Sequence, residues 1–159
     1  MNIFTESHQE LLKSLIKHQV KFLLIGGYAV IYYGYKRTTG DMDLWFEPSN
    51  ENKLKIIEVL KEFDFDKDGI KHISQLDFTK PLAFHFWEEP ERVDCLTMVS
   101  NVDFDDAFNQ KTIADIEGIY VPIIQYKHLI MSKMTTNRLK DKADIEELQK
   151  IEAIKKHNK

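Results

Sequence analysis

The feature that most constrains the fold of this chain is the stretch from residue 21 to residue 48, KFLLIGGYAVIYYGYKRTTGDMDLWFEP. A run of apolar residues leads into the pair Gly26-Gly27, and a second apolar segment follows. The chain then enters a third apolar segment through two acidic residues, Asp41 and Asp43. Short apolar runs bounded by glycine are typical of buried strands, so the stretch predicts a strand, a helix and a strand in succession.

Asp41 and Asp43 stand at the start of the second predicted strand. Side chains alternate across a strand, so the two carboxylates should point to one face while Met42 and Leu44 point to the other. Like charges on one face repel each other and lose solvation near a core. A positive group should therefore lie between them, and a divalent metal ion is the simplest candidate.

The glycine pair predicts a sharp turn between the first strand and a helix over residues 28–33. Glycine lets the backbone turn sharply and come close to a ligand. The amino terminus of the following helix offers free N–H groups, which favour an anion. Gly26 and Gly27 are therefore candidates for contact with a phosphate group.

A third acidic residue, Asp94, lies in a later apolar segment. Residues 81–87 and 92–99 are separated by the polar sequence EEPE and predict a β-hairpin. A carboxylate inside an apolar strand needs a partner. Two explanations stay open at this point: a salt bridge with Arg92 or Arg37, or a metal site shared with the two upstream acids.

The remaining sequence predicts elements that surround these segments. Apolar spacing and polar capping residues indicate the following: helices over about 6–18, 50–63, 125–134 and from 137, two strands within 111–124, and a turn over 65–69. The helix over 125–134 is expected to expose Lys127 and Lys133.

The Gly-Gly turn, the Asp-x-Asp strand and the later Asp94 resemble the nucleotidyltransferase superfamily of the polymerase beta type. Within it the chain is most similar to small stand-alone members, the toxin-antitoxin-associated and the lincosamide-type antibiotic nucleotidyltransferases. The resemblance covers residues from about 20 to 148. It implies an α+β fold, a mixed β-sheet flanked by helices with a helical C-terminus. It also implies a single domain over residues 1–159, with helices over about 125–156 packed on the same core.

The resemblance further implies transfer of a nucleoside monophosphate from a nucleoside triphosphate, such as ATP, to a hydroxyl of an unidentified acceptor. Asp41, Asp43 and Asp94 would be catalytic and would bind two Mg²⁺ ions, with Mn²⁺ as a substitute. The residues expected to bind the nucleotide are Gly26, Gly27, Arg37, Thr39, Lys133 and Lys140. A small molecule, a tRNA end and a protein each offer a suitable hydroxyl, and no motif selects among them.

Alternatives stay open for both the activity and the basic residues. A catalytically weak or inactive relative would bind a nucleotide or a partner in a toxin-antitoxin-type system. A metal-dependent phosphohydrolase could use the same acids, but such enzymes usually bring histidines to their metals, and the sequence has no histidine cluster. Lys133 and Lys140, near the C-terminus, could bind phosphate. Alternatively, these lysines could be solvated while Asp141 and Asp144 cap the last helix.

Composition narrows the class of protein. The 159 residues, 43% hydrophobic and 30% charged, are typical of a globular protein. We expect a cytoplasmic protein, because no apolar run reaches the roughly 20 residues that span a bilayer, the amino terminus has no signal-peptide pattern, and Cys95 is the single cysteine.

The net charge of −4 argues against a protein that coats nucleic acid nonspecifically. The distribution of charge along the chain is more informative about a possible site. Residues 127–159 carry nine basic and five acidic side chains, and the preceding residues carry 13 and 21. A basic tail beside an acidic segment fits a site where lysines meet a triphosphate, and it also fits ordinary solvated helix faces. The small size leaves little room for an acceptor-binding domain, so a homodimer or a partner protein could complete the pocket.

Overall fold

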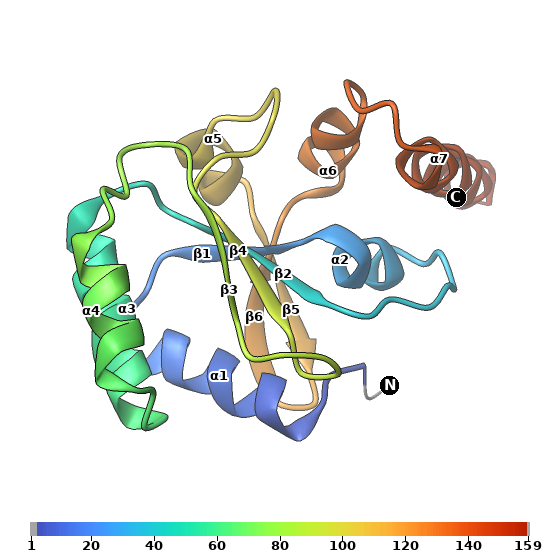
Figure 1. Ribbon diagram of the computed structural model, residues 1–159. Helices are drawn as coiled ribbons and strands as arrows, with labels where there is room; N and C mark the ends of the chain where they lie inside the picture. Colours follow the sequence, from blue (N-terminus) through green and yellow to red (C-terminus); the bar gives the residue numbers. More distant parts are fainter. Residues whose placement is uncertain (1–2, 159) are drawn as a thin grey trace.

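A computed structural model describes residues 3–158, which form one six-stranded mixed sheet flanked by helices (Figure 1). The strands are β1 (Phe22–Ile25), β2 (Met42–Phe46), β3 (Ala83–Phe86), β4 (Val93–Leu96), β5 (Thr112–Ile116) and β6 (Ile119–Ile123). The helices are α1 (Glu6–Lys17), α2 (Gly26–Tyr32), α3 (Asn50–Glu62), α4 (Lys67–Gln75), α5 (Phe104–Asn109), α6 (Tyr126–Lys133) and α7 (Leu139–His157). The domain predicted over 1–159 thus includes three residues, 1, 2 and 159, that lie outside the described part.

The strands follow the order β3-β4-β2-β1-β6-β5 across the sheet. Strand β2 is antiparallel to β1 and parallel to β4, and β1 is parallel to β6. The edge strands β3 and β5 form hairpins with β4 and β6. The strand that follows Asp41 therefore lies between the strand that leads into the glycine pair and the strand that carries Asp94.

The central strands β1 and β2 are apolar because both of their faces are covered. All four side chains of β1 are buried, and so are four of the five in β2. A strand covered on both faces reads as a continuous apolar run rather than as an alternating pattern. Asp43 is the exception in β2, so its carboxylate lies at the margin of the core.

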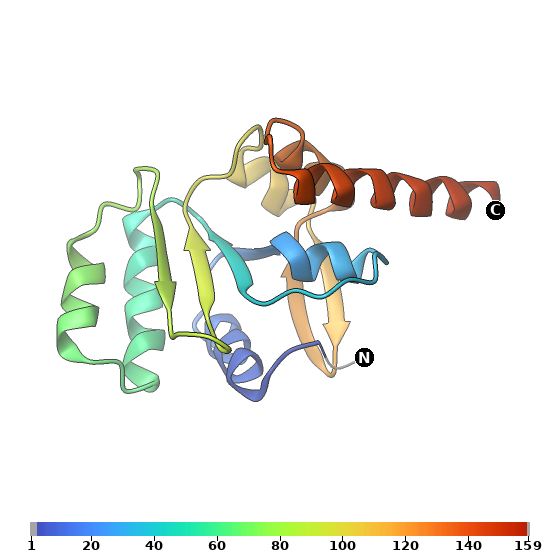
Figure 2. The ribbon, with the colours of Figure 1, turned by 45° about the vertical axis from the view of Figure 1, so that its right-hand side comes forward.

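Apart from α2, which connects β1 to β2, the helices form two groups around the sheet. In Figures 1 and 2, α1, α3 and α4 lie at the lower left, whereas α5, α6 and α7 lie along the top. Leu148 at the middle of α7 is buried, but Ile154 is 61% exposed. The second half of α7 accordingly extends beyond the sheet (Figure 2). Across residues 3–158, no helix has the length and apolar character needed to span a membrane.

The predicted fold class is confirmed, and most helices and strands lie close to their predicted ranges, whereas α5 has no counterpart among the predicted elements. The turn predicted over residues 65–69 is wrong in part. Asp66 accepts a hydrogen bond from the backbone N–H of Gly69 and caps α4, so the chain becomes helical from Lys67. The acidic and glycine residues that indicate a turn therefore also form the first turn of a capped helix. The predicted exposure of Lys133 is wrong as well, because its side chain is buried.

Candidate active site

Three acidic side chains meet near the start of β2 and β4. Asp43 and Asp94 are direct neighbours in the parallel pairing of the two strands. Asp41 precedes β2 and points to the same face as Asp43 by strand alternation. All three side chains line one cavity. The structure therefore brings together the three residues that the sequence indicated as catalytic, with Asp94 on the same side of the sheet as the upstream pair.

The two glycines, which have no Cβ atom, leave room for the side chains of Asp43, Thr39 and Arg37. Gly26 has a φ of +68°, and a Cβ atom there would lie 2.2 Å from Oδ2 of Asp43. A Cβ atom on Gly27 would lie 2.2 Å from Oγ1 of Thr39 and 3.2 Å from Nη2 of Arg37. Only glycine adopts the φ of Gly26 without strain and brings the backbone this close to the carboxylate of Asp43. The turn from β1 into α2 is thus packed directly against the carboxylate cluster.

A cavity of about 370 Å³ opens over the three acids. Its lining residues are Gly27, Thr39, Gly40, Asp41, Asp43, Glu89, Asp94, Arg138 and Lys140. Of the residues predicted to bind the nucleotide, Gly27, Thr39 and Lys140 belong to this lining, whereas Gly26, Arg37 and Lys133 lie outside it. The cavity therefore has acidic side chains on one part of its wall and basic side chains on another.

The surroundings of Asp43 disfavour its charged form. Burial, followed by the nearby carboxylates of Asp94 and Asp41, raises the pKa of Asp43 from 3.8 to about 6. Lys133 and Lys140 oppose this shift. A carboxylate that is destabilised by burial and by like charges would be stabilised by an added cation.

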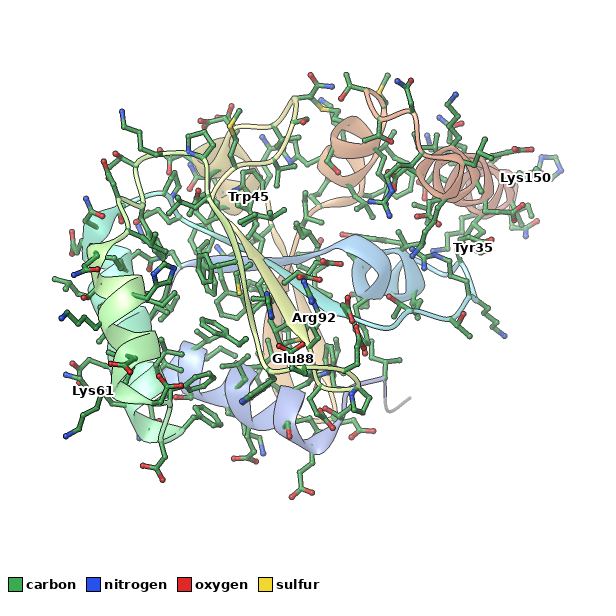
Figure 3. All side chains as sticks on the ribbon, viewed as in Figure 1. Tyr35, Trp45, Lys61, Glu88, Arg92 and Lys150 are labelled. Carbon is green, nitrogen blue, oxygen red and sulfur yellow. The ribbon has the colours of Figure 1, made fainter. Side chains whose placement is uncertain are left out.

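Arg92 supplies the positive charge that lies beside the acids. Its Nε atom donates a hydrogen bond to Oδ1 of Asp94 at 3.0 Å and lies 3.8 Å from Oδ2 of Asp41. Figure 3 shows its side chain at the front of the sheet, above Glu88. Of the two arginines proposed as partners of Asp94, the structure therefore selects Arg92. It also lines a second cavity of about 240 Å³, on the β3 side of Asp43 and Asp94.

The donor set at this cluster fits a hard divalent cation. Mg²⁺ binds carboxylate oxygens together with phosphate oxygens and water, and three carboxylates are available here. Oδ1 of Asp41 is buried and has no hydrogen-bond partner among residues 3–158, so this oxygen atom is available as a ligand. As the side chains stand, no group of three His, Cys, Asp or Glu residues within 3–158 is arranged to hold a metal ion. Binding would thus require the carboxylates to rearrange around the ion.

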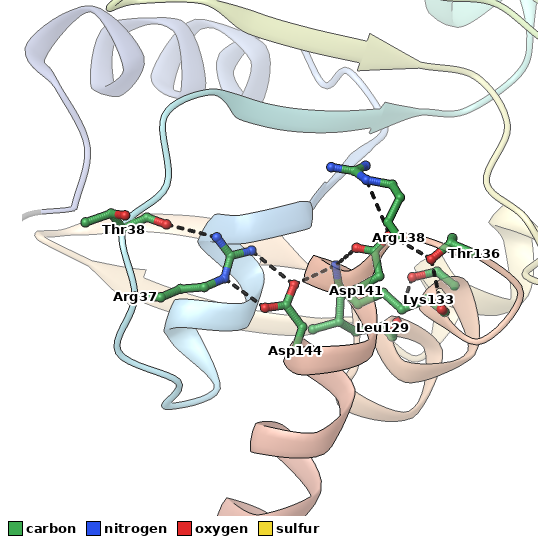
Figure 4. Close-up of polar contacts among 9 residues, drawn as sticks. Arg37, Thr38, Leu129, Lys133, Thr136, Arg138, Asp141 and Asp144 are labelled. Carbon is green, nitrogen blue, oxygen red and sulfur yellow. Dashed lines mark hydrogen bonds and ion pairs between the residues drawn. The ribbon is translucent and has the colours of Figure 1, made fainter.

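Arg37 and Lys133 belong to a buried ionic network beside the cavity (Figure 4). Nε and Nη2 of Arg37 donate to the two carboxylate oxygens of Asp144 at 2.9 and 3.1 Å. Nζ of Lys133 lies 2.9 Å from Oδ1 of Asp141 and 3.1 Å from Oδ2 of Asp144. These ion pairs tie the loop before β2 to α6 and α7, so both basic residues have partners within the protein.

The network also differs from the alternative in which the lysines near the C-terminus are solvated while Asp141 and Asp144 cap the last helix. The residue before α7 is Arg138, and it makes no capping hydrogen bond with its side chain. Asp141 accepts hydrogen bonds from Lys133 and from Oγ1 of Thr136 instead of capping the helix. Within α6 and α7, Lys133 is thus buried rather than solvated, while Lys140 is exposed at the cavity.

Sequence reasoning missed two acidic residues of the site. Glu89 in the loop between β3 and β4 lines the cavity, and a hydrogen bond with Asp41 raises the pKa of the Glu89 carboxyl. The sequence signal was the run Glu88-Glu89-Pro90-Glu91, which was interpreted only as a polar turn. Asp144 was proposed as a helix cap, and nothing in the local sequence indicates its pairing with Arg37.

Comparison with known proteins places the chain among nucleotide-transferring enzymes. The profile of one protein family, described as "Nucleotidyl transferase of unknown function (DUF2204)", matches residues 5–159. No curated protein sequence matches the chain significantly.

Several solved structures share the fold. One is the lincomycin-bound lincosamide antibiotic adenylyltransferase LnuA, with 15% identity, coverage of 95% of this chain and 99% of that chain, and a TM-score of 0.55. Another is the antibiotic-resistance factor ANT(2'')-Ia, with 12% identity, coverage of 96% and 90%, and a TM-score of 0.55. The same protein in complex with adenylyl-2''-tobramycin gives 12% identity, coverage of 94% and 95%, and a TM-score of 0.51. At these identities the likeness establishes the fold alone.

Proposed function

Because the chain belongs to the DUF2204 family of nucleotidyl transferases, we propose that it transfers a nucleoside monophosphate from a nucleoside triphosphate to an acceptor hydroxyl at the Asp41, Asp43 and Asp94 cluster. The observation that carries this assignment is the register of β2 against β4, which pairs Asp43 with Asp94. Because of that register, the carboxylates line one cavity together with Gly27 and Lys140. Such a cavity offers groups of both signs to a triphosphate and its cation.

The donor triphosphate would occupy the 370 Å³ cavity. Lys140 and Arg138 are exposed cationic side chains in its lining and would bind phosphate oxygens through charge-assisted hydrogen bonds. Gly27 lets the backbone approach the phosphates, and the hydroxyl of Thr39 lies beside it. These groups would hold the α-phosphorus in line with the incoming oxygen, and such positioning supplies much of the catalysis in phosphoryl transfer.

In the reaction, the acceptor oxygen forms a bond to the α-phosphorus while the bond from that phosphorus to the leaving pyrophosphate breaks. Asp94 would accept the proton of the attacking hydroxyl, because it lies on β4, the strand of the cluster that pairs with β3, and faces the cavity on that side. Asp41 and Asp43 would hold Mg²⁺. When bound, the cation supplies positive charge to the attacking and leaving oxygens.

For the substrates, the related structures suggest the first compounds to test. LnuA and ANT(2'')-Ia are described with lincomycin and with an adenylylated tobramycin. We therefore propose ATP as the first donor and a small hydroxyl-bearing molecule as the first acceptor class.

A second candidate is a non-catalytic nucleotide-binding module. The observation that favours it is Arg92, whose guanidinium already neutralises Asp94 and approaches Asp41. A protein with its acids paired in this way could bind a nucleotide or a partner without turnover. Nucleotide binding without any transfer product would favour this candidate.

The proposal is tested by titration calorimetry with each of four nucleoside triphosphates, in Mg²⁺ and in EDTA, followed by mass spectrometry of acceptors for an added nucleoside monophosphate. The Asp43→Asn variant should lose Mg²⁺-dependent nucleotide binding and reduce transfer by at least about 100-fold, because it removes a carboxylate ligand. Asp105→Asn, an exposed acid on α5, serves as the control. The assignment is refuted if Asp43→Asn binds the Mg²⁺ nucleotide as tightly as the wild type.

A further inference from the structure

Arg92 lies at the point where the proposed function needs a divalent cation. Its Nε contacts Oδ1 of Asp94 at 3.0 Å and is 3.8 Å from Oδ2 of Asp41. The structure thus places a single positive charge from the chain itself between two of the three acids. An ion bound by the same oxygen atoms would be repelled by this guanidinium and would compete with it for Asp94.

The backbone of Arg92 is held in place, whereas its side chain has room to move. Its carbonyl oxygen accepts a hydrogen bond at 3.2 Å from the backbone N–H of Met42, the first residue of β2. The side chain is 33% exposed. It lines the 240 Å³ cavity beside β3 and is absent from the lining of the 370 Å³ cavity. A rotation of this side chain within the smaller cavity would therefore move the guanidinium away from Asp94 without moving the strand.

The loop that follows β3 offers a new partner to the displaced guanidinium. Glu88 is 82% exposed, and its Oε1 lies 3.3 Å from Nε2 of His85. His85 pairs directly with Asp94 across the hairpin and lines the same 240 Å³ cavity as Arg92. The hydrogen bond to Asp94, followed by the charges of Asp94, Asp41 and Glu88, raises the pKa of Arg92. An acidic side chain is therefore available beside His85, which itself lines the cavity.

From these contacts we propose that Arg92 is a positioning residue that occupies the carboxylate cluster while it is empty and swings off Asp94 when a divalent cation binds. The inference rests on the proposed function, since it takes the three acids as the cation site. Removing the charge of Arg92 should strengthen the binding of a divalent cation in the absence of any nucleotide.

The experiment is a titration of the nucleotide-free protein with Mn²⁺, in which electron paramagnetic resonance measures the free ion. Arg92→Gln and Arg92→Met both remove the charge and should lower the Kd for Mn²⁺ about fivefold or more, because the competing cation is lost. Arg92→Lys keeps a positive charge and should stay within about twofold of the wild type. Lys61→Gln removes one charge from an exposed pair with Glu58 on α3 and should also leave the Kd unchanged (Figure 3).

The outcomes separate this inference from the proposed function. If both charge-removing variants fold, as judged by thermal denaturation, and bind Mn²⁺ no more tightly than Lys61→Gln, Arg92 does not compete for the site and the inference is wrong. That result leaves the proposed function standing as long as the wild type binds Mn²⁺ together with a nucleotide. If the wild type and all variants bind no Mn²⁺ with or without nucleotide, the cation site is wrong and both proposals are overturned.

Discussion

Arg37 and Asp144 lie 107 residues apart in the chain and form a two-point ion pair, with Nε to Oδ1 at 2.9 Å and Nη2 to Oδ2 at 3.1 Å. Asp144 is 1% exposed and also receives the buried ammonium group of Lys133. The loop that carries the first acid of the site is therefore joined to the C-terminal helix through one carboxylate. Through this ion pair, α7 helps to hold the loop that carries Asp41.

We expect Asp144→Ala to lower the free energy of unfolding by about 3 to 5 kcal/mol, because it leaves buried positive charge without its partner. Glu146→Ala, on the same helix, removes a pair with Lys150 whose side chains are 60% and 69% exposed, and should cost less than about 1 kcal/mol. Urea denaturation of both variants measures the difference. Equal losses in the two variants would contradict a structural role for the network.

The stability of the metal-free protein should depend on the ionisation of Asp43. Its folded-state pKa of about 6 lies above the ordinary value of 3.8, so the folded protein holds the proton more tightly than the unfolded chain does. The resulting stabilisation is complete below about pH 4 and is lost as the pH rises through about 6. The loss amounts to about 2 to 3 kcal/mol.

This dependence is measured by chemical denaturation in EDTA between pH 4 and pH 7. Asp43→Asn cannot ionise, so its advantage over the wild type in free energy of unfolding should grow by about 2 to 3 kcal/mol across that range. Asp105→Asn should show no such growth. A difference between Asp43→Asn and the wild type that stays constant with pH would show that the carboxylate is not strained by its surroundings.

The two glycines should be intolerant of a methyl group for steric reasons. Gly26→Ala combines a φ of +68° with a Cβ 2.2 Å from Oδ2 of Asp43, and should cost about 2 to 4 kcal/mol of unfolding free energy. Gly40→Ala is the control, because a Cβ there meets no atom within 4 Å. It should change stability by less than about 0.5 kcal/mol.

For Gly27, the expected clash of an added Cβ with Thr39 can be tested by removing the Thr39 side chain. A Cβ at this position meets Oγ1 of Thr39 at 2.2 Å and Cβ of Thr39 at 2.8 Å. The double variant Gly27→Ala with Thr39→Gly should therefore recover part of the stability that Gly27→Ala loses. Thermal denaturation of the single and double variants gives the coupling, and purely additive effects would mean that the contact with Thr39 is not the cause.

Lys140 should contribute to nucleotide binding rather than to stability. Its side chain is exposed and lines the cavity over the acids. Lys140→Gln should raise the Kd for the Mg²⁺ nucleotide about tenfold, through loss of a charge-assisted contact with a phosphate. Lys142→Gln, two residues further along α7 and outside the cavity lining, should leave the Kd unchanged. Calorimetric titration that finds equal affinities for the two variants would remove Lys140 from the donor site.

Much of the site was predictable because it depends on local rules. Strand alternation predicted Asp41 and Asp43 on one face, and the glycine pair predicted a tight turn, which the structure packs against Asp43 and Thr39. The short polar run before Arg92 predicted the hairpin that carries Asp94. The roles assigned to these residues in catalysis and metal binding stay predictions.

Sequence alone determined most of the elements, because burial and backbone preference leave their mark every two or every 3.6 residues. The two short helices α4 and α5 were not predicted from it. Only the tertiary structure decided the partners of the charges: Arg92 for Asp94, Arg37 for Asp144, and the burial of Lys133. A basic side chain has no periodic signature of its partner, since the pairing depends on strand register and on where α7 packs. Those are set by contacts between segments far apart in the chain, which no local pattern records.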